Sequence, residues 1–242
     1  MRYKMKKKIF DTSPQAAEYI ADTVAAILAK KADTLFCFAA GHSSLEAFTA
    51  IIKRDLDFSN ARFVAMDEWL NIAPDADGSC TNFLYVNFFN KINAKQENIC
   101  CFDGFSSNPE AECKAVEMQI AAWGGLDYLL LGMGMNGHLA LNEPEESLEL
   151  GTRVVELAEK TKAVAVKYFS KGMPSITQGI TLGVKAMLKA RVVQLGVFGE
   201  HKREPVNQLF TYQIPNKEFP ASAIMGRGNV EIILDQAAVG EE

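Results

Sequence analysis

Four short segments of the chain carry side chains that could do chemistry, and the richest is LGMGMNGHLALNEP, residues 131–144. The imidazole of His138 could move a proton near neutral pH, and the carboxylate of Glu143 could orient that ring and support its protonated form. Asn136 and the surrounding glycines describe a polar, tightly turned loop rather than a core position. The segment therefore predicts a catalytic loop that transfers protons.

The same segment also contains the Gly-x-Gly-x-x-Gly pattern of dinucleotide-binding loops, at Gly132, Gly134 and Gly137. In that motif the third glycine opens an uninterrupted helix, whose N-terminus binds the pyrophosphate. Pro144 lies seven residues after Gly137, and Gly151 follows soon after. Because these residues leave little room for such a helix, the sequence favours the catalytic loop over a nicotinamide site. No cofactor and no metal are expected.

A second candidate is the acidic pair Asp67 and Glu68, in MDEW at the end of an apolar run. Side chains alternate along a strand, so only one of the two acids can face a given site. A carboxylate held partly out of water at a strand end is suited to act as a general base. The alternative is an ordinary loop acid or a helix cap.

Two further segments could bind an anion. The turn GHSS, residues 41–44, separates an apolar run from a helical pattern, and N–H groups with a hydroxyl at a helix N-terminus form a natural anion site. Alternatively, Ser43 or Ser44 only caps that helix. The segment GEHKRE, residues 199–204, contributes Lys202 after a later apolar run.

Each of these segments lies at or just after the end of an apolar run that predicts a strand. The predicted strands lie at residues 34–41, 61–69, 97–102, 126–134, 152–157, 191–199 and 229–235. Helical spacing of apolar residues predicts helices at residues 14–30, 45–54, 82–92, 109–123, 181–190 and 203–212. This alternation predicts one α/β, Rossmann-like domain over residues 1–242, with a mostly parallel sheet and helices on both faces. Residues 1–12 are expected to form a flexible N-terminal segment.

The order of the elements also predicts where the site lies. In open α/β sheets, ligands bind beyond the carboxyl ends of the strands. Because the four chemical segments all follow predicted strands, we expect them to converge at one edge of the sheet.

The composition argues against several other classes of protein. A net charge of −5 does not suit a nucleic-acid partner, because binding to nucleic acid depends largely on neutralised phosphates. No apolar run approaches the ~20 residues that span a membrane, and the basic N-terminus lacks the apolar core of a signal peptide. A cytoplasmic protein without a membrane partner is therefore expected. The five cysteines form no C-x-x-C pair, which argues against a zinc site.

With these segments assembled, the chain resembles the glucosamine-6-phosphate deaminase/isomerase family, which is related in fold to 6-phosphogluconolactonases and ribose-5-phosphate isomerases. The resemblance covers nearly the whole chain. It is carried by FCFAAGHSSLEAF, FVAMDEW and LGMGMNGHLALNEPEESL, with softer matches in GITLGVKAML and ASAIMGRGNVEIILD. It implies an enzyme that converts a hexosamine 6-phosphate into a keto-sugar phosphate and ammonia.

The resemblance implies a role for each catalytic candidate. Asp67 would be the base that moves a proton between C2 and C1 of the opened sugar. His138, supported by Glu143, would open the pyranose ring by carrying a proton to or from the ring oxygen. Asn136 stands where glucosamine-6-phosphate deaminases carry an aspartate in contact with the catalytic histidine. An amide cannot stabilise an imidazolium by charge, so Glu143 would have to do more.

The resemblance also implies a phosphate site. Gly41 and Ser43 would hold the 6-phosphate together with Lys202. Lys167 would stand in for a second cationic ligand, which is an arginine in the family. His42 replaces a small residue in the phosphate turn, where it either contacts the phosphate or narrows the access.

The substrate within this family is predicted from a few residues. The form Met-Asn-Gly-His-Leu at 135–139, together with DEW and GITLG, is closer to the galactosamine-6-phosphate branch of the family. The predicted reaction is therefore galactosamine 6-phosphate to tagatose 6-phosphate and ammonia. The alternatives are glucosamine-6-phosphate deaminase, 6-phosphogluconolactonase and a non-enzymatic sugar-phosphate sensor. Homo-oligomer formation is left open.

Overall fold

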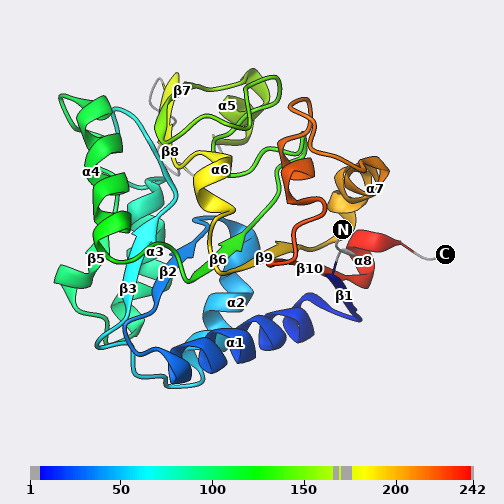
Figure 1. The fold of residues 1–242 in the computed structure, drawn as a ribbon, viewed down its shortest axis with the longest axis horizontal. Helices are drawn as coiled ribbons and strands as arrows, with labels where there is room; N and C mark the ends of the chain where they lie inside the picture. The colour runs from blue at the N-terminus through cyan, green and yellow to red at the C-terminus, as the bar shows by residue number, and fades with distance from the viewer. Residues whose placement is uncertain (1–5, 166–168, 170–175, 241–242) are drawn as a thin grey trace.

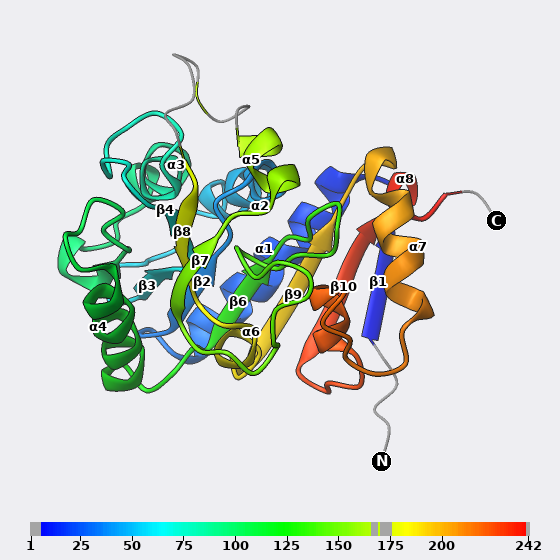
Figure 2. The same ribbon diagram turned by 90° about the horizontal axis from the view of Figure 1, so that it is seen from above.

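The computed structural model describes residues 6–165, 169 and 176–240. Within these residues the fold is built on a seven-stranded sheet whose neighbouring strands all pair in parallel. In spatial order the strands are β1 (Lys6–Phe10), β10 (Val230–Asp235), β9 (Val192–Val197), β6 (Tyr128–Leu131), β2 (Leu35–Phe38), β3 (Arg62–Ala65) and β5 (Ile99–Cys100). Figure 2 shows β1, β10, β9, β6, β2 and β3 side by side across the molecule. The prediction of a mostly parallel sheet is confirmed.

Helices cover both faces of this sheet. One face is covered by α1 (Ser13–Lys30), α2 (His42–Ile52) and α3 (Cys80–Asn87), the other by α4 (Pro109–Ala122), α6 (Val184–Met187) and α7 (Arg203–Thr211). In Figure 1, α1 and α2 lie below the sheet and α6 lies above it. Two short helices, α5 (Glu159–Ala165) and α8 (Gln236–Val239), and four 3-10 segments, Phe89–Lys91, Gln96–Asn98, Glu200–Lys202 and Pro220–Ile224, complete the helical structure of the described residues.

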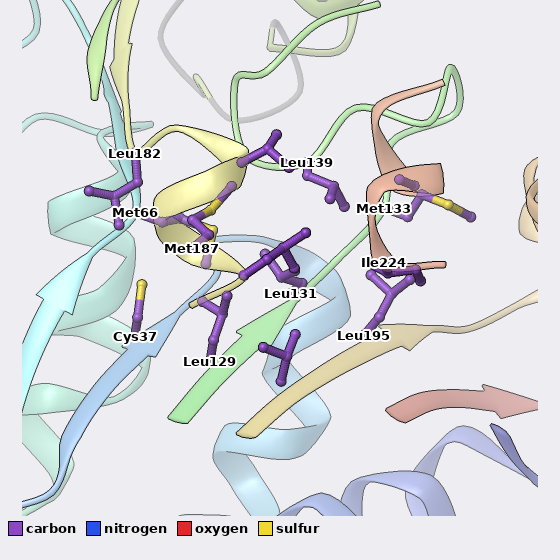
Figure 3. Close-up of a cluster of buried hydrophobic side chains, with 14 of the residues drawn as sticks. Cys37, Met66, Leu129, Leu131, Met133, Leu139, Leu182, Met187, Leu195 and Ile224 are labelled. Atoms are coloured by element: carbon purple, nitrogen blue, oxygen red, sulfur yellow. The ribbon is translucent and has the colours of Figure 1, made fainter. Parts of the chain in front are cut away.

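The alternation of side chains along β2 explains the two faces. Phe36 and Phe38 pack with α1 and α2, whereas Cys37 points to the opposite face. Figure 3 shows that second face, where Cys37, Leu129 and other apolar side chains lie beneath α6. Strands that are apolar on both faces are typical of a sheet covered by helices on both sides.

A second, smaller sheet was not foreseen. It is antiparallel and contains β4 (Asp67–Trp69), β8 (Gln178–Thr181) and β7 (Arg153–Glu156). The run 61–69, predicted as one strand, is divided at Met66, where the chain leaves the large sheet to pair with β8. The predicted helix at 181–190 is reduced to one turn at Val184–Met187, since Thr181 belongs to β8 and residues 188–190 form a turn.

The expectation of a flexible segment at residues 1–12 was wrong for the described part of that segment. Residues 6–10 form β1, which pairs in parallel with β10, and α1 begins at Ser13. The strand is charged and exposed, so its apolar pattern is weak. It is held instead by the ladder to β10 and by the ammonium of Lys8, which lies 3.8 Å from the ring centroid of Tyr19.

The strand order sets the position of a ligand crevice. β2 and β6 are neighbours in the large sheet. The next strand of this sheet along the chain after β2 is β3, which lies on one side of the pair, and the next after β6 is β9, which lies on the other side. Ligands of open α/β sheets bind at such a reversal, beyond the carboxyl ends of the strands. The segments that follow β2 and β6 are GHSS and the loop of His138. Among the described residues, no helix is both long and apolar enough to cross a membrane.

Candidate active site

Asp67 and His138, which are 71 positions apart in the sequence, line one cavity of about 260 Å³. One wall of this cavity is formed by the start of α3, with Ser79, Cys80 and Phe83 among its residues. The predicted convergence of MDEW and the histidine loop is therefore found in the structure.

The glycines of the loop after β6 make room for side chains rather than for a pyrophosphate. A Cβ atom on Gly134 would lie 2.2 Å from the imidazole of His138, so only glycine allows the ring to pack there. Gly137 has a φ of +79°, and a Cβ atom on it would lie 2.5 Å from the ring of Phe219. The N–H of Gly134 donates to the carbonyl of His138 at 3.0 Å, which closes the turn. The loop is thus built around the histidine.

A chain of hydrogen bonds leads from His138 into the protein. Nδ1 of His138 lies 2.7 Å from Oδ1 of Asn136, and Nδ2 of Asn136 donates to Oε2 of Glu143 at 3.0 Å. The hydroxyl of Thr161, on α5, donates to the other oxygen of Glu143. Glu143 is buried and its carboxylate lies 3.9 Å from Nδ1 of His138, beyond hydrogen-bond distance. Glu143 therefore reaches the imidazole through the amide of Asn136.

This chain fixes the tautomer of His138. An ionised carboxylate only accepts hydrogen bonds, so the amide nitrogen of Asn136 must face Glu143 and its oxygen must face the ring. Nδ1 of His138 then carries a proton, and Nε2 is left as the basic nitrogen. Burial lowers the pKa of His138, an effect that Glu143 opposes and the ammonium of Lys202 reinforces. The imidazole is accordingly neutral near pH 7.

Asp67 is held beside the loop by β8. The carbonyl of Met66 accepts the N–H of Leu182 at 2.8 Å, and Asp67 is paired with Thr181 across the small sheet. Thr181, the last residue of β8, also contacts the histidine loop. Its hydroxyl accepts a hydrogen bond from the N–H of Leu141 at 3.2 Å. Thr181 and Leu182 thus join the strand of the acid to the loop of the histidine.

The environment of Asp67 suits a base. Burial raises the pKa of Asp67 to about 7, the neighbouring charge of Glu68 adds to the rise, and a hydrogen bond from the thiol of Cys80 opposes it. A carboxyl group with such a pKa is partly ionised at neutral pH and can both take and return a proton. Glu68 is fully buried and caps α3, which agrees with the cap considered for one of the two acids.

The predicted anion site lies at the start of α2. The helix begins at His42 with Gly41 as its N-cap, and no side chain caps it, so capping is not the role of Ser43 or Ser44. The hydroxyl of Ser43 lies close to Gly132, where an added Cβ atom would be 2.9 Å from it.

The other predicted phosphate ligands differ in position. Nζ of Lys202 donates to the carbonyl of Met133 at 2.6 Å, so Lys202 and Ser43 flank the same two residues after β6. Burial lowers the pKa of Lys202. The ring of His42 lies 6.4 Å from that of Phe83, a residue of the cavity wall. Lys167 lies outside the described residues.

Sequence reasoning missed Thr161 and Cys80. Thr161 belongs to a short helix after β7 that was not predicted, so only its place after the histidine loop could have drawn attention to it. Cys80 was considered only as one of five cysteines that form no C-x-x-C pair, yet it lines the cavity.

The fold and the cavity define an α/β protein with an aspartate and a histidine in one cavity at the carboxyl edge of its sheet. Residues 10–233 match the model of the family described as glucosamine-6-phosphate isomerases/6-phosphogluconolactonase, and the chain belongs to this family. The family expected from the sequence motifs is thereby confirmed, and with it the prediction that the chain is an enzyme.

Curated relatives and solved structures agree with this assignment. Glucosamine-6-phosphate deaminase of Thermoanaerobacter sp. (strain X514) is 33% identical over 232 residues, which cover 94% of this chain and 90% of that protein. The same enzyme of Lysinibacillus sphaericus (strain C3-41) is 33% identical over 227 residues, 92% of this chain and 95% of that protein. The structure of a monomeric glucosamine-6-phosphate deaminase superposes with a TM-score of 0.92 at 28% identity and covers 97% of this chain and 98% of its own. A 6-phosphogluconolactonase from Trypanosoma brucei shares the fold, with a TM-score of 0.79 at 18% identity over 98% of both chains.

Proposed function

We propose that the protein is a hexosamine-6-phosphate deaminase/isomerase that converts an amino-sugar phosphate into a keto-sugar phosphate and ammonia. The observation that carries this proposal is the joint presence of Asp67, with a pKa of about 7, and neutral His138 in one cavity. An isomerisation needs a base that removes a proton from carbon, and a second group that handles protons on oxygen. The deaminase names of the curated relatives support the same reaction.

The substrate binds by its 6-phosphate at the start of α2. The N–H groups of the first turn, the hydroxyl of Ser43 and the ammonium of Lys202 are the binding groups. Burial lowers the pKa of Lys202. A phosphate dianion bound beside this lysine raises that pKa again, because a nearby negative charge favours the protonated ammonium.

His138 opens the pyranose ring. Its Nε2 takes the proton of the C1 hydroxyl and delivers a proton to the ring oxygen, which gives the open aldehyde. The Asn136–Glu143 chain keeps the second ring proton on Nδ1, so that Nε2 alone exchanges protons.

Asp67 then removes the proton from C2, which the C1 carbonyl makes acidic. The product is an enolamine, and return of the proton at C1 gives a ketimine. Water adds to the ketimine carbon and ammonia leaves, which yields the keto sugar 6-phosphate. The substrate's own carbonyl supplies the electron sink, so these steps need no cofactor.

The configuration of the substrate at C4, which distinguishes galactosamine 6-phosphate from glucosamine 6-phosphate, is a finer part of the proposal. Asn136 and the surrounding Met-Asn-Gly-His-Leu segment favour galactosamine 6-phosphate as the substrate. The names of the curated relatives favour glucosamine 6-phosphate. A 6-phosphogluconolactonase is a weaker alternative, because hydrolysis of an ester needs no base to remove a proton from carbon.

An ammonia-release assay tests the proposal. Glucosamine 6-phosphate, galactosamine 6-phosphate and their N-acetylated forms are compared at equal concentration, with 6-phosphogluconolactone as a separate substrate. We expect ammonia from at least one free amine and none from the N-acetylated sugars. Hydrolysis of the lactone without ammonia release from either amine would contradict the proposal.

A further inference from the structure

The acid next to the proposed base does not line the cavity, but it holds one of the cavity walls. Glu68 is completely buried, and its carboxylate accepts hydrogen bonds from the first residues of α3. The N–H of Cys80 donates to Oε1 at 2.9 Å, while the hydroxyl of Ser79 and the N–H of Thr81 donate to Oε2 at 2.7 and 2.8 Å. The N–H of Trp69 gives Oε1 a second bond at 2.9 Å. Each carboxylate oxygen is thus fully used by the protein.

These bonds satisfy the N-terminus of α3. The first N–H groups of a helix have no partner within the helix. Glu68 accepts those of residues 80 and 81, and the hydroxyl of Ser79 accepts the N–H of Asn82 at 3.1 Å. The helix dipole favours a negative charge at this end. Glu68 therefore binds its own strand, β4, to the start of α3.

The same two elements carry the reacting side of the cavity. Asp67 precedes Glu68 on β4, and the alternation of side chains along the strand sends the two acids to opposite sides. Asp67 lines the cavity, as do Ser79 and Cys80 at the start of α3. A displacement of α3 against β4 would change the distance from the base to the wall that it faces.

We propose that Glu68 is a positioning residue for Asp67: its buried carboxylate clamps β4 to the N-terminus of α3 and so fixes the base against the cavity wall. The proposal rests on the role of Asp67 as the base in the proposed function. Glu68 also acts on the base by its charge, which is the second cause, after burial, of the raised pKa of Asp67. The clamp and the charge are separable by mutation.

The variant Glu68→Gln tests both effects. Glutamine keeps the shape but lacks the charge, and its amide nitrogen accepts no hydrogen bond, so the N–H of either Cys80 or Thr81 loses its acceptor. We expect kcat to fall about 10-fold to 100-fold with KM nearly unchanged, since a misplaced base slows the reaction without touching the phosphate site. The acid limb of kcat/KM should move down by about one pH unit, because loss of a like charge lowers the pKa of Asp67.

Two further variants separate positioning from general loss of stability. Ser79→Ala removes one donor from Glu68 and keeps both charges, so kcat should fall while the acid limb stays in place. Asp127→Asn changes another buried carboxylate, which is bound by Lys31 and Arg191 at the opposite edge of the sheet. It should lower the melting temperature but leave the acid limb and kcat unchanged. If Glu68→Gln does not fold, the kcat of Ser79→Ala still tests whether the hydrogen bonds of Glu68 to the start of α3 position the base.

A titration without substrate separates this proposal from the proposed function. The carboxyl carbon of Asp67, assigned with Asp67→Asn, is followed by carbon-13 NMR in wild type and in Glu68→Gln. A downward shift of the Asp67 pKa supports the influence of Glu68 even if no amino sugar releases ammonia. The proposal would be overturned by three results together. The titration of Asp67 would be the same in both proteins, kcat would not fall in Glu68→Gln or Ser79→Ala, and Glu68→Gln would only lose melting temperature, as Asp127→Asn does.

Discussion

The amide oxygen of Asn136 accepts a hydrogen bond from Nδ1 of His138 at 2.7 Å, and no carboxylate takes this place among the described residues. The negative charge of Glu143 lies one amide further away, where Asn136 donates to it. A neutral partner fixes the orientation of the ring but stabilises its protonated form less than an adjacent carboxylate does. This arrangement agrees with the lowered pKa of His138.

Replacement of Asn136 by leucine removes the acceptor for Nδ1 and the donor to Glu143. We expect kcat to fall about 100-fold, since the histidine loses its fixed tautomer, while KM changes little. Steady-state kinetics measure both constants. Asn60→Ala, at an exposed turn, is the matched control. A kcat close to that of the wild type in Asn136→Leu would show that the chain to Glu143 has no part in catalysis.

The raised pKa of Asp67 predicts how stability depends on pH. The folded protein holds the proton of Asp67 up to about pH 7, whereas the unfolded chain releases it near pH 4. Ionisation of Asp67 therefore destabilises the fold as pH rises between these values. Asp67→Asn should raise the free energy of unfolding by roughly 2 kcal/mol at about pH 8, a value reduced for solvent screening of this half-buried group. At about pH 4 the substitution should change the free energy of unfolding little.

Urea unfolding of Asp67→Asn and wild type at the two pH values checks this difference. An equal effect at both values, or a loss of stability above neutral pH, would mean that the carboxyl group is not held in its neutral form.

Cys80 is expected to lower the pKa of the base. Its thiol donates a hydrogen bond to Asp67, and this bond favours the ionised carboxylate. Cys80→Ala should move the acid limb of kcat/KM to higher pH, in the direction opposite to Glu68→Gln. Cys80→Ser, which keeps a donor, should leave the limb near its wild-type position. The dependence of kcat/KM on pH is measured for the wild type and both variants. A shift of the acid limb to lower pH in Cys80→Ala would rule out the hydrogen bond from Cys80 to Asp67.

Lys202 is expected to act in binding. Lys202→Ala removes a half-buried ammonium that binds the carbonyl of Met133, so KM for the sugar phosphate should rise about 10-fold to 100-fold with a smaller change in kcat. Lys185→Ala, at an exposed lysine outside the cavity, is the control. Inhibition by inorganic phosphate should weaken in parallel. An unchanged KM and unchanged phosphate inhibition would remove Lys202 from the phosphate site.

Much of the fold could be predicted because its signals are local. The apolar runs of β2, β6, β9 and β10 are bounded by polar turns, and the helices α1 and α4 show a proline in their first turn. The parallel direction of the strands follows from the helices that lie between successive strands. The convergence of Asp67 and His138 followed from the rule that ligands bind at the carboxyl ends.

The features that were missed depend on contacts distant in sequence. β1 is a charged edge strand that pairs with β10, and β8 pairs with β7 and with β4, which turns away from the large sheet at Met66. The link from Asn136 to Glu143 and Thr161 also needed coordinates, since no sequence period relates a loop to α5. Residue chemistry alone did not distinguish the two acids of MDEW, and only the resemblance assigned the base to Asp67. The role of Glu68 became visible only with the start of α3 beside it.

The most direct test of the account is proton exchange at C2 of the substrate in deuterated water. The amino-sugar phosphate that releases ammonia is incubated with wild type and with Asp67→Asn, and deuterium at C2 is followed by proton NMR, while binding is measured by calorimetry. We predict that the wild type exchanges the C2 proton and releases ammonia, and that Asp67→Asn binds the sugar but does neither. Exchange and turnover by Asp67→Asn near the wild-type rate would contradict the assignment of Asp67 as the base.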